Sequence, residues 1–203
     1  MKKLLIVLFL ISIFVCGCEV EEKTQVKPEK QIEKPTEVKK ILMVIAPNNF
    51  KDEEYFIPKE IFQKEGFVVK TASLNKIAIS VEGKKVDADF TIDDIKFDFD
   101  AIVFSGGPGA AVYFNNEKLF EIVRRSYNEG KIIGAICIAP SILANSGILK
   151  GKKATSFKSE ESNLKQNGAI YIDEGVVVDG NIITANGPKA SEEFANKIVE
   201  ALR

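Results

Sequence analysis

Residues 131–147, KIIGAICIAPSILANSG, decide the predicted fold of this chain. The apolar run KIIGAI is typical of a buried strand, and Pro140 suits the first turn of a helix over residues 139–146. Cys137 lies between the two. A nucleophile at a strand-to-helix turn is the arrangement of the nucleophile elbow, which presents a side chain above the sheet. The alternative is a buried cysteine that packs as a small hydrophobic side chain.

The alternation of strand and helix continues on both sides of this stretch. Short apolar runs predict strands at 41–46, 67–73 and 100–104, and amphipathic runs predict helices at 53–65, 115–128 and 188–202. Two hairpins are expected, one at Gly83 and one at Asp179-Gly180. With 203 residues, this order predicts one α/β domain with a mostly parallel sheet. Ligands of such sheets bind beyond the carboxyl ends of the strands.

The first 18 residues, MKKLLIVLFLISIFVCGC, have the pattern of an export signal. Two lysines precede an apolar run over residues 4–15, which is shorter than the ~20 residues needed to span a bilayer. Residues 15–18, Val-Cys-Gly-Cys, resemble the lipobox of prokaryotic lipoproteins, in which cleavage precedes the last cysteine and lipid is attached to it. We therefore expect lipid on Cys18. The alternative is an uncleaved amino-terminal anchor.

Residues 19–40 are rich in Lys, Glu and Pro and show no apolar periodicity. Such a composition cannot bury enough apolar surface to fold, so a disordered linker is expected. The folded domain is then 41–203, held at the outer, extracytoplasmic face of the cell membrane by the lipid anchor.

Composition excludes several classes of function. The net charge is −1, which gives no basic surface for nucleic acid. The chain has no histidine, so no imidazole base is available and a typical zinc site is not expected. The glycine-rich turn SGGPG, residues 105–109, matches neither nucleotide-binding motif. We expect no metal and no cofactor.

One side chain and one turn are candidate partners of Cys137. Glu54 opens the helix after the first strand, so a parallel sheet places it at the same edge as the cysteine. The amide of Gly107 is a candidate oxyanion donor. The alternatives are a solvated carboxylate and an ordinary tight turn. A helix N-terminus stabilises a thiolate, so the pKa of Cys137 is expected below its free value of ~8.5.

Four segments, in their order and spacing, resemble the ThiJ/PfpI superfamily, which includes the Parkinson-linked protein deglycase and a set of intracellular peptidases. They are FKDEEYFIP (50–58), IVFSGGPGA (102–110), GAICIAPSILANSGILKGKKAT (134–155) and GNIITANGPKASEEFANKIVEAL (180–202). The resemblance implies a flavodoxin-like three-layer α/β sandwich of the class I glutamine amidotransferase type. It also implies a reactive cysteine at Cys137, a carboxylic acid partner at Glu54, backbone donors at Gly106, Gly107 and Ile138, and a homodimer.

The chain departs from that family at two positions. Ile138 and Phe157 stand where its two branches have histidines. This counts against a Cys-His peptidase. We expect a membrane-tethered protein whose reactive elbow cysteine acts in oxidative or reactive-carbonyl stress chemistry, with a small reactive electrophile or oxidant as its ligand. The alternatives are a Cys-dependent hydrolase or glyoxalase/deglycase that uses Glu54 as acid and base, and a non-catalytic binding domain.

Overall fold

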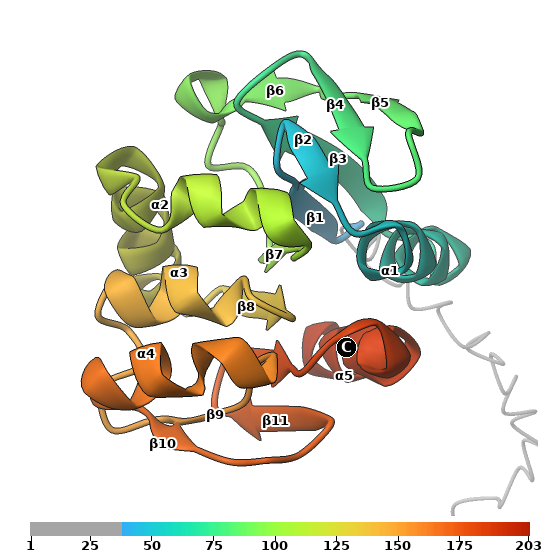
Figure 1. The fold of residues 1–203 in the computed structure, drawn as a ribbon. Coiled ribbons are helices and arrows are strands. Elements are labelled where there is room, and N and C mark those ends of the chain that lie inside the picture. The colour runs from blue at the N-terminus through green and yellow to red at the C-terminus, as the bar shows by residue number, and fades with distance from the viewer. Residues whose placement is uncertain (1–37) are drawn as a thin grey trace, which may run out of the picture. The chain divides into compact units, whose positions relative to one another are not determined.

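The computed structural model describes residues 38–203, which form an α/β domain around a seven-stranded sheet (Figure 1). The order of the strands is β11-β12-β8-β7-β1-β3-β6. Their bounds are β1 Lys40–Val44, β3 Val68–Ser73, β6 Phe90–Thr91, β7 Ala101–Phe104, β8 Ile132–Ile136, β11 Val176–Asp179 and β12 Ile182–Ala185. All neighbours in this sheet are parallel except β11 and β12. The predicted α/β fold with a mostly parallel sheet is confirmed.

Helices cover both faces of the sheet and give the domain three layers. In Figure 1, α1 and α5 lie on one side of the sheet, and α2, α3 and α4 lie on the other. Their bounds are α1 Asp52–Lys64, α2 Glu117–Asn128, α3 Pro140–Asn145, α4 Glu161–Gln166 and α5 Ser191–Leu202. Short 3-10 helices lie at η1 Ile92–Asp94, η2 Pro108–Tyr113, η3 Lys158–Glu160 and η4 Pro188–Ala190.

The central strands form the core because both of their faces are covered. Every residue of β7, Ala101–Phe104, is buried, and so are the last four residues of β1. Strands buried on both faces are apolar at every position, which explains why these strands are continuous apolar runs in the sequence. Phe194 and Ile198 of α5 complete the core from one side.

A second, three-stranded sheet follows the order β2-β4-β5, with bounds Asn48–Phe50, Ile77–Ser80 and Lys85–Asp87. The pairing of β4 with β5 is antiparallel and confirms the hairpin predicted at Gly83. The antiparallel β11 and β12 confirm the second hairpin. A two-stranded sheet of β9, Lys153–Ala154, and β10, Ile170–Tyr171, was not predicted, because two-residue strands carry no periodic pattern.

Across residues 38–203, every helix is too short or too polar to cross a lipid bilayer. The predicted export signal, Cys18 and almost all of the linker lie outside the described residues.

Candidate active site around Cys137

Cys137 lies directly between β8 and α3, in a left-handed backbone conformation with φ of 65°. For a residue with a Cβ this conformation costs roughly 1–2 kcal/mol. Two hydrogen bonds from distant segments hold it: the Cys137 N–H donates to the Ala185 carbonyl at 2.9 Å, and the Phe157 N–H donates to the Cys137 carbonyl at 2.7 Å. Backbone strain that the surroundings impose in this way is concentrated at functional sites.

Glu54 lies in the first turn of α1 and is fully buried. Pro58, four residues later, has no N–H to donate to the Glu54 carbonyl, so that carbonyl has no partner within the helix. The Ser105 hydroxyl donates to it instead at 3.0 Å. The Gly106 N–H donates to Oε2 of the Glu54 side chain at 3.1 Å. The residues that follow β7 therefore fix both the backbone and the carboxyl group of Glu54.

The Gly106-Gly107 pair allows this close approach. A Cβ at Gly106 would lie 2.7 Å from the Cys137 Cβ and 2.7 Å from Glu54 Oε2, so no side chain fits there. Gly107 has φ of 90°, which favours glycine, and a Cβ there would collide with the backbone at Lys51. The turn predicted from SGGPG thus brings Glu54 and Cys137 together.

Burial raises the pKa of Glu54 to about 7, although interactions with the Cys137 thiol and the Gly106 amide oppose the shift. The second carboxyl oxygen, Oε1, is buried and accepts no hydrogen bond within the described part of the chain. A carboxyl group with so few donors is stabilised in its neutral form. Near neutral pH, Glu54 therefore exchanges readily between the acid and the carboxylate.

Burial, together with the negative charge of Glu54, raises the pKa of Cys137 to about 12, while the amides of Gly107 and Ile138 act in the opposite direction. The prediction of a pKa below ~8.5 is therefore wrong. The helix after the elbow, α3, has only six residues, and desolvation of the buried thiol outweighs it. Because the two groups interact strongly, their apparent pKa values of about 7 and about 12 belong to the pair. Between them, one proton is shared by the carboxyl group and the sulfur.

The three expected backbone donors do not have equal roles. The amides of Gly107 and Ile138 interact with the Cys137 sulfur, whereas the Gly106 amide is engaged by Glu54. Gly106 therefore positions the carboxyl group, and Gly107 and Ile138 are the donors available at the sulfur.

Residues 39–201 match the DJ-1/PfpI family along their whole length. The chain belongs to the DJ-1/PfpI family. It is 40% identical over 207 residues to an uncharacterized protein of Methanocaldococcus jannaschii, an alignment that covers 100% of this chain and 98% of that protein. It is 35% identical to Deglycase PfpI of Pyrococcus furiosus, over 80% of this chain and 99% of the deglycase.

A solved structure of similar fold is the ThiJ/PfpI domain protein from Brachyspira murdochii. The TM-score is 0.79 at 34% sequence identity, and the match covers 81% of this chain and 96% of that one. This likeness and the family match confirm the flavodoxin-like arrangement that the sequence predicts.

A groove of about 540 Å³ adjoins this DJ-1/PfpI site. Phe157, in the place of a family histidine, lines it and is 48% exposed, while Ile138 packs against the core. Other residues that line the groove are Lys51 and Glu53, which are close to Glu54 in the sequence, and residues 186–189 after β12. The roles of Ser105, Ala185 and residues 186–189 at the site were not predicted from the sequence, because only folding brings these segments to the elbow. Within residues 38–203, no three His, Cys, Asp or Glu side chains are grouped to hold a metal ion.

Proposed function

We propose that the chain is a membrane-tethered DJ-1/PfpI protein whose Cys137 thiol reacts with small carbonyl compounds or oxidants. The observation that carries this proposal is geometric: a fully buried carboxyl group, Glu54, and a thiol held in a strained elbow, Cys137, both lie against Gly106. The relative named Deglycase PfpI supports carbonyl chemistry, because it aligns with 80% of this chain.

The reaction with a 2-oxoaldehyde such as methylglyoxal follows from the shared proton. As the sulfur attacks the aldehyde carbon, the thiol proton passes to the Glu54 carboxylate and a C–S bond forms. The electron pair of the carbonyl moves to its oxygen, for which the amides of Gly107 and Ile138 are the available donors. The oxygen then takes the proton from Glu54, which returns to the carboxylate. The product is a hemithioacetal on Cys137.

Oxidation uses the same pair. Hydrogen peroxide converts the thiol to a sulfenic acid and water, and a second peroxide converts the sulfenic acid to a sulfinic acid and water. Cys137 is the one cysteine within residues 38–203, so no second thiol in the domain can resolve the sulfenic acid as a disulfide. Glu54 in its acid form donates a hydrogen bond to a sulfinate oxygen, which favours the sulfinate as the end point.

A second candidate is turnover as a Cys-dependent hydrolase or glyoxalase/deglycase. The pKa of Glu54, raised to about 7, favours it, because general acid-base catalysis is most efficient when the pKa lies near the working pH. A Cys-His peptidase is opposed by the absence of histidine from the sequence. A binding domain with an inert thiol is the third alternative.

The tether is part of the proposal. Cys18 follows the apolar run and the Gly of the lipobox-like motif, and residues 19–40 link it to the domain, which then faces the outside of the membrane. The homodimer expected from the family resemblance also stays a prediction. Lipid on the wild-type protein, absent in Cys18→Ser, would support the tether. A lipid-free wild-type protein with a different amino terminus would exclude it.

Intact-mass analysis tests the chemistry. The full chain and Cys137→Ser are treated separately with methylglyoxal and with graded hydrogen peroxide. We expect a carbonyl adduct and a sulfinic acid in the wild type and neither in Cys137→Ser. Release of a hydroxy acid by the wild type, but not by the variant, would establish turnover. If the wild-type thiol stays unmodified under both treatments, the binding domain with an inert thiol is the alternative that remains.

A further inference from the structure

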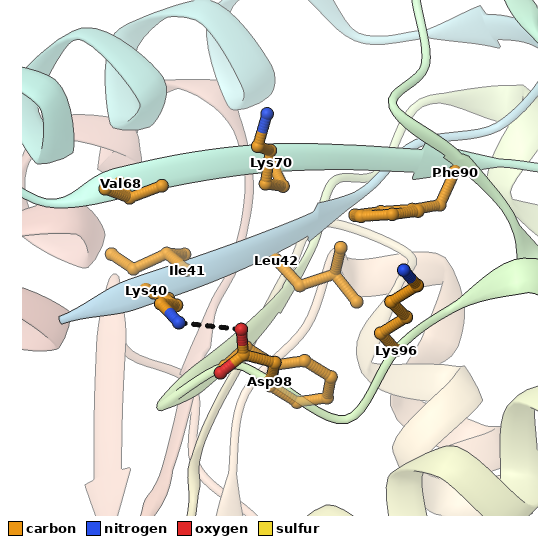
Figure 2. A pocket seen from close by; sticks show the side chains of 9 residues that line it. Lys40, Ile41, Leu42, Val68, Lys70, Phe90, Lys96 and Asp98 are labelled. Atoms are coloured by element: carbon orange, nitrogen blue, oxygen red, sulfur yellow. Dashed lines mark hydrogen bonds and ion pairs between the residues drawn. The ribbon is translucent and has the colours of Figure 1, made fainter.

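A second pocket lies around the amino-terminal halves of β1 and β3 (Figure 2). Its lining comes from these two strands, from β6 and from residues 96–99, which precede β7. Cys137 and Glu54 lie at the carboxyl ends of the parallel strands, and neither lines this pocket. It is therefore separate from the reactive thiol.

The walls of this pocket are mostly apolar and enclose about 170 Å³. Leu42 and Phe99 are buried, Phe90 is half-buried, and Val68 is 42% exposed at the edge. An engineered protein cavity of about 150 Å³ with similar walls binds benzene. The space thus suits a group of the size of one aromatic ring.

The charged groups of the lining are three lysines and one carboxylate. Lys40 forms an ion pair with Asp98 at 2.6 Å, and Lys70 forms one with Asp89 at 2.8 Å. Lys96 has neither an ion pair nor a side-chain hydrogen bond within residues 38–203, and in Figure 2 its ammonium group points toward Phe90. The lining therefore has a net positive charge, with one ammonium group available beside the apolar walls.

We propose that this pocket binds a small monocarboxylate with an apolar body of about one aromatic ring. The body packs between Phe90, Phe99 and Leu42, and the carboxylate pairs with Lys96. An ion pair at such an exposed rim adds little affinity, so most of the binding comes from the buried ring. The volume matches a body of this size, and the unpaired ammonium favours an anion over a neutral compound of the same shape.

Benzoate is the probe, with benzyl alcohol as a neutral ring of similar size and acetate as a carboxylate without a ring. The full chain is titrated with each, and binding is followed by amide NMR shifts. We expect saturable binding of benzoate with the largest shifts in β1, β3 and β6, weaker binding of benzyl alcohol and none of acetate. Lys96→Gln should weaken benzoate about two- to fivefold and leave benzyl alcohol unchanged. Lys118→Gln on α2 is the matched control, since Lys118 lies outside the pocket lining, and should change neither.

Equal affinity for benzoate and benzyl alcohol would overturn the proposal, and so would equal losses of both in Lys96→Gln. Shifts confined to the Cys137 groove, or no saturable binding, would also overturn it, the latter showing that another part of the chain or a second copy covers the pocket. Cys137→Ser should bind benzoate like the wild type, so this result does not depend on the proposed thiol chemistry.

Discussion

The two hollows at opposite ends of the strands differ in what forms them. At the elbow, groups from α1, from residues 105–107 after β7, from β12 and from residue 157 converge on Cys137 and Glu54 through hydrogen bonds and glycine contacts. At the pocket of Figure 2, apolar side chains line the walls, and Lys70 and Lys96 are exposed at the rim. Several independent contacts thus fix each atom position at the elbow, whereas the side chains that line the pocket can shift. Proton transfer between Glu54 and Cys137 needs a rigid region like the elbow, whereas binding of a small apolar body needs only an adaptable region like the pocket.

The largest difference in stability between the elbow and the pocket is expected from Gly106→Ala, which adds one methyl group at the elbow. Gly106→Ala places a Cβ 2.7 Å from the Cys137 Cβ and 2.8 Å from the Ile136 carbonyl oxygen, so backbone must move. We expect a loss of about 3 kcal/mol in the free energy of unfolding and loss of thiol reactivity. Val68→Ala at the pocket should cost under about 1 kcal/mol, since Val68 is partly exposed. Chemical denaturation of both variants gives the comparison, and similar losses would contradict it.

The stability of the elbow should fall as pH rises. The pKa of buried Glu54 is raised from 4.5 to about 7 on folding, so the folded state binds more protons than the unfolded state between these values. The stabilisation is complete below about pH 4.5 and is lost as pH passes 7, a change of about 3 kcal/mol.

Denaturation of wild type and Glu54→Gln across pH 4 to 8 measures this change. The difference between their unfolding free energies should follow the fall, because glutamine does not titrate. Lys96→Gln at the pocket is the control and should keep the wild-type pH profile. A difference that is constant with pH would show that Glu54 has an ordinary pKa.

Replacing the Glu54 carboxyl group with an amide should slow alkylation of the Cys137 thiol, although the substitution also removes a negative charge. In the wild type, Glu54 is the group that can accept the thiol proton as the sulfur attacks, because its pKa of about 7 lies near the working pH. In Glu54→Gln, burial alone keeps the thiol pKa above its usual value. Alkylation at neutral pH should therefore be at least about tenfold slower than in the wild type. A faster reaction in the variant would show that Glu54 acts only by repulsion.

Among the changes at the elbow, the smallest expected effect comes from Ser105→Ala. It removes the hydroxyl that donates to the Glu54 carbonyl and leaves that buried oxygen without its partner. We expect a loss of about 1 kcal/mol and a shift in the pH at which alkylation is half-maximal. Ser126→Ala is a matched control, since Ser126 donates to a carbonyl of α2 far from the elbow. It should cost similar stability without changing the alkylation profile.

Local patterns were enough to predict the central strands, the elbow and the place of Glu54. The apolar runs identified β1, β7 and β8, and the order of elements put Glu54 and Cys137 at one edge. The direction of the Cys137 pKa shift was predicted wrongly, because the burial that raises it comes from segments distant in the sequence. The strand β2 was missed because Asn48 and Asn49 are polar and exposed.

The hydrogen bonds at Cys137 can form only after later parts of the chain have been synthesised. Ala185 and Phe157, which fix the elbow, leave the ribosome after the cysteine does. β8 gains its β12 neighbour only when residues 182–185 have been made. Until then the thiol belongs to an incomplete sheet and has neither its strained geometry nor its full burial. In a growing chain, Cys137 is therefore an ordinary cysteine, and it acquires its shared proton only when synthesis of the domain is nearly complete.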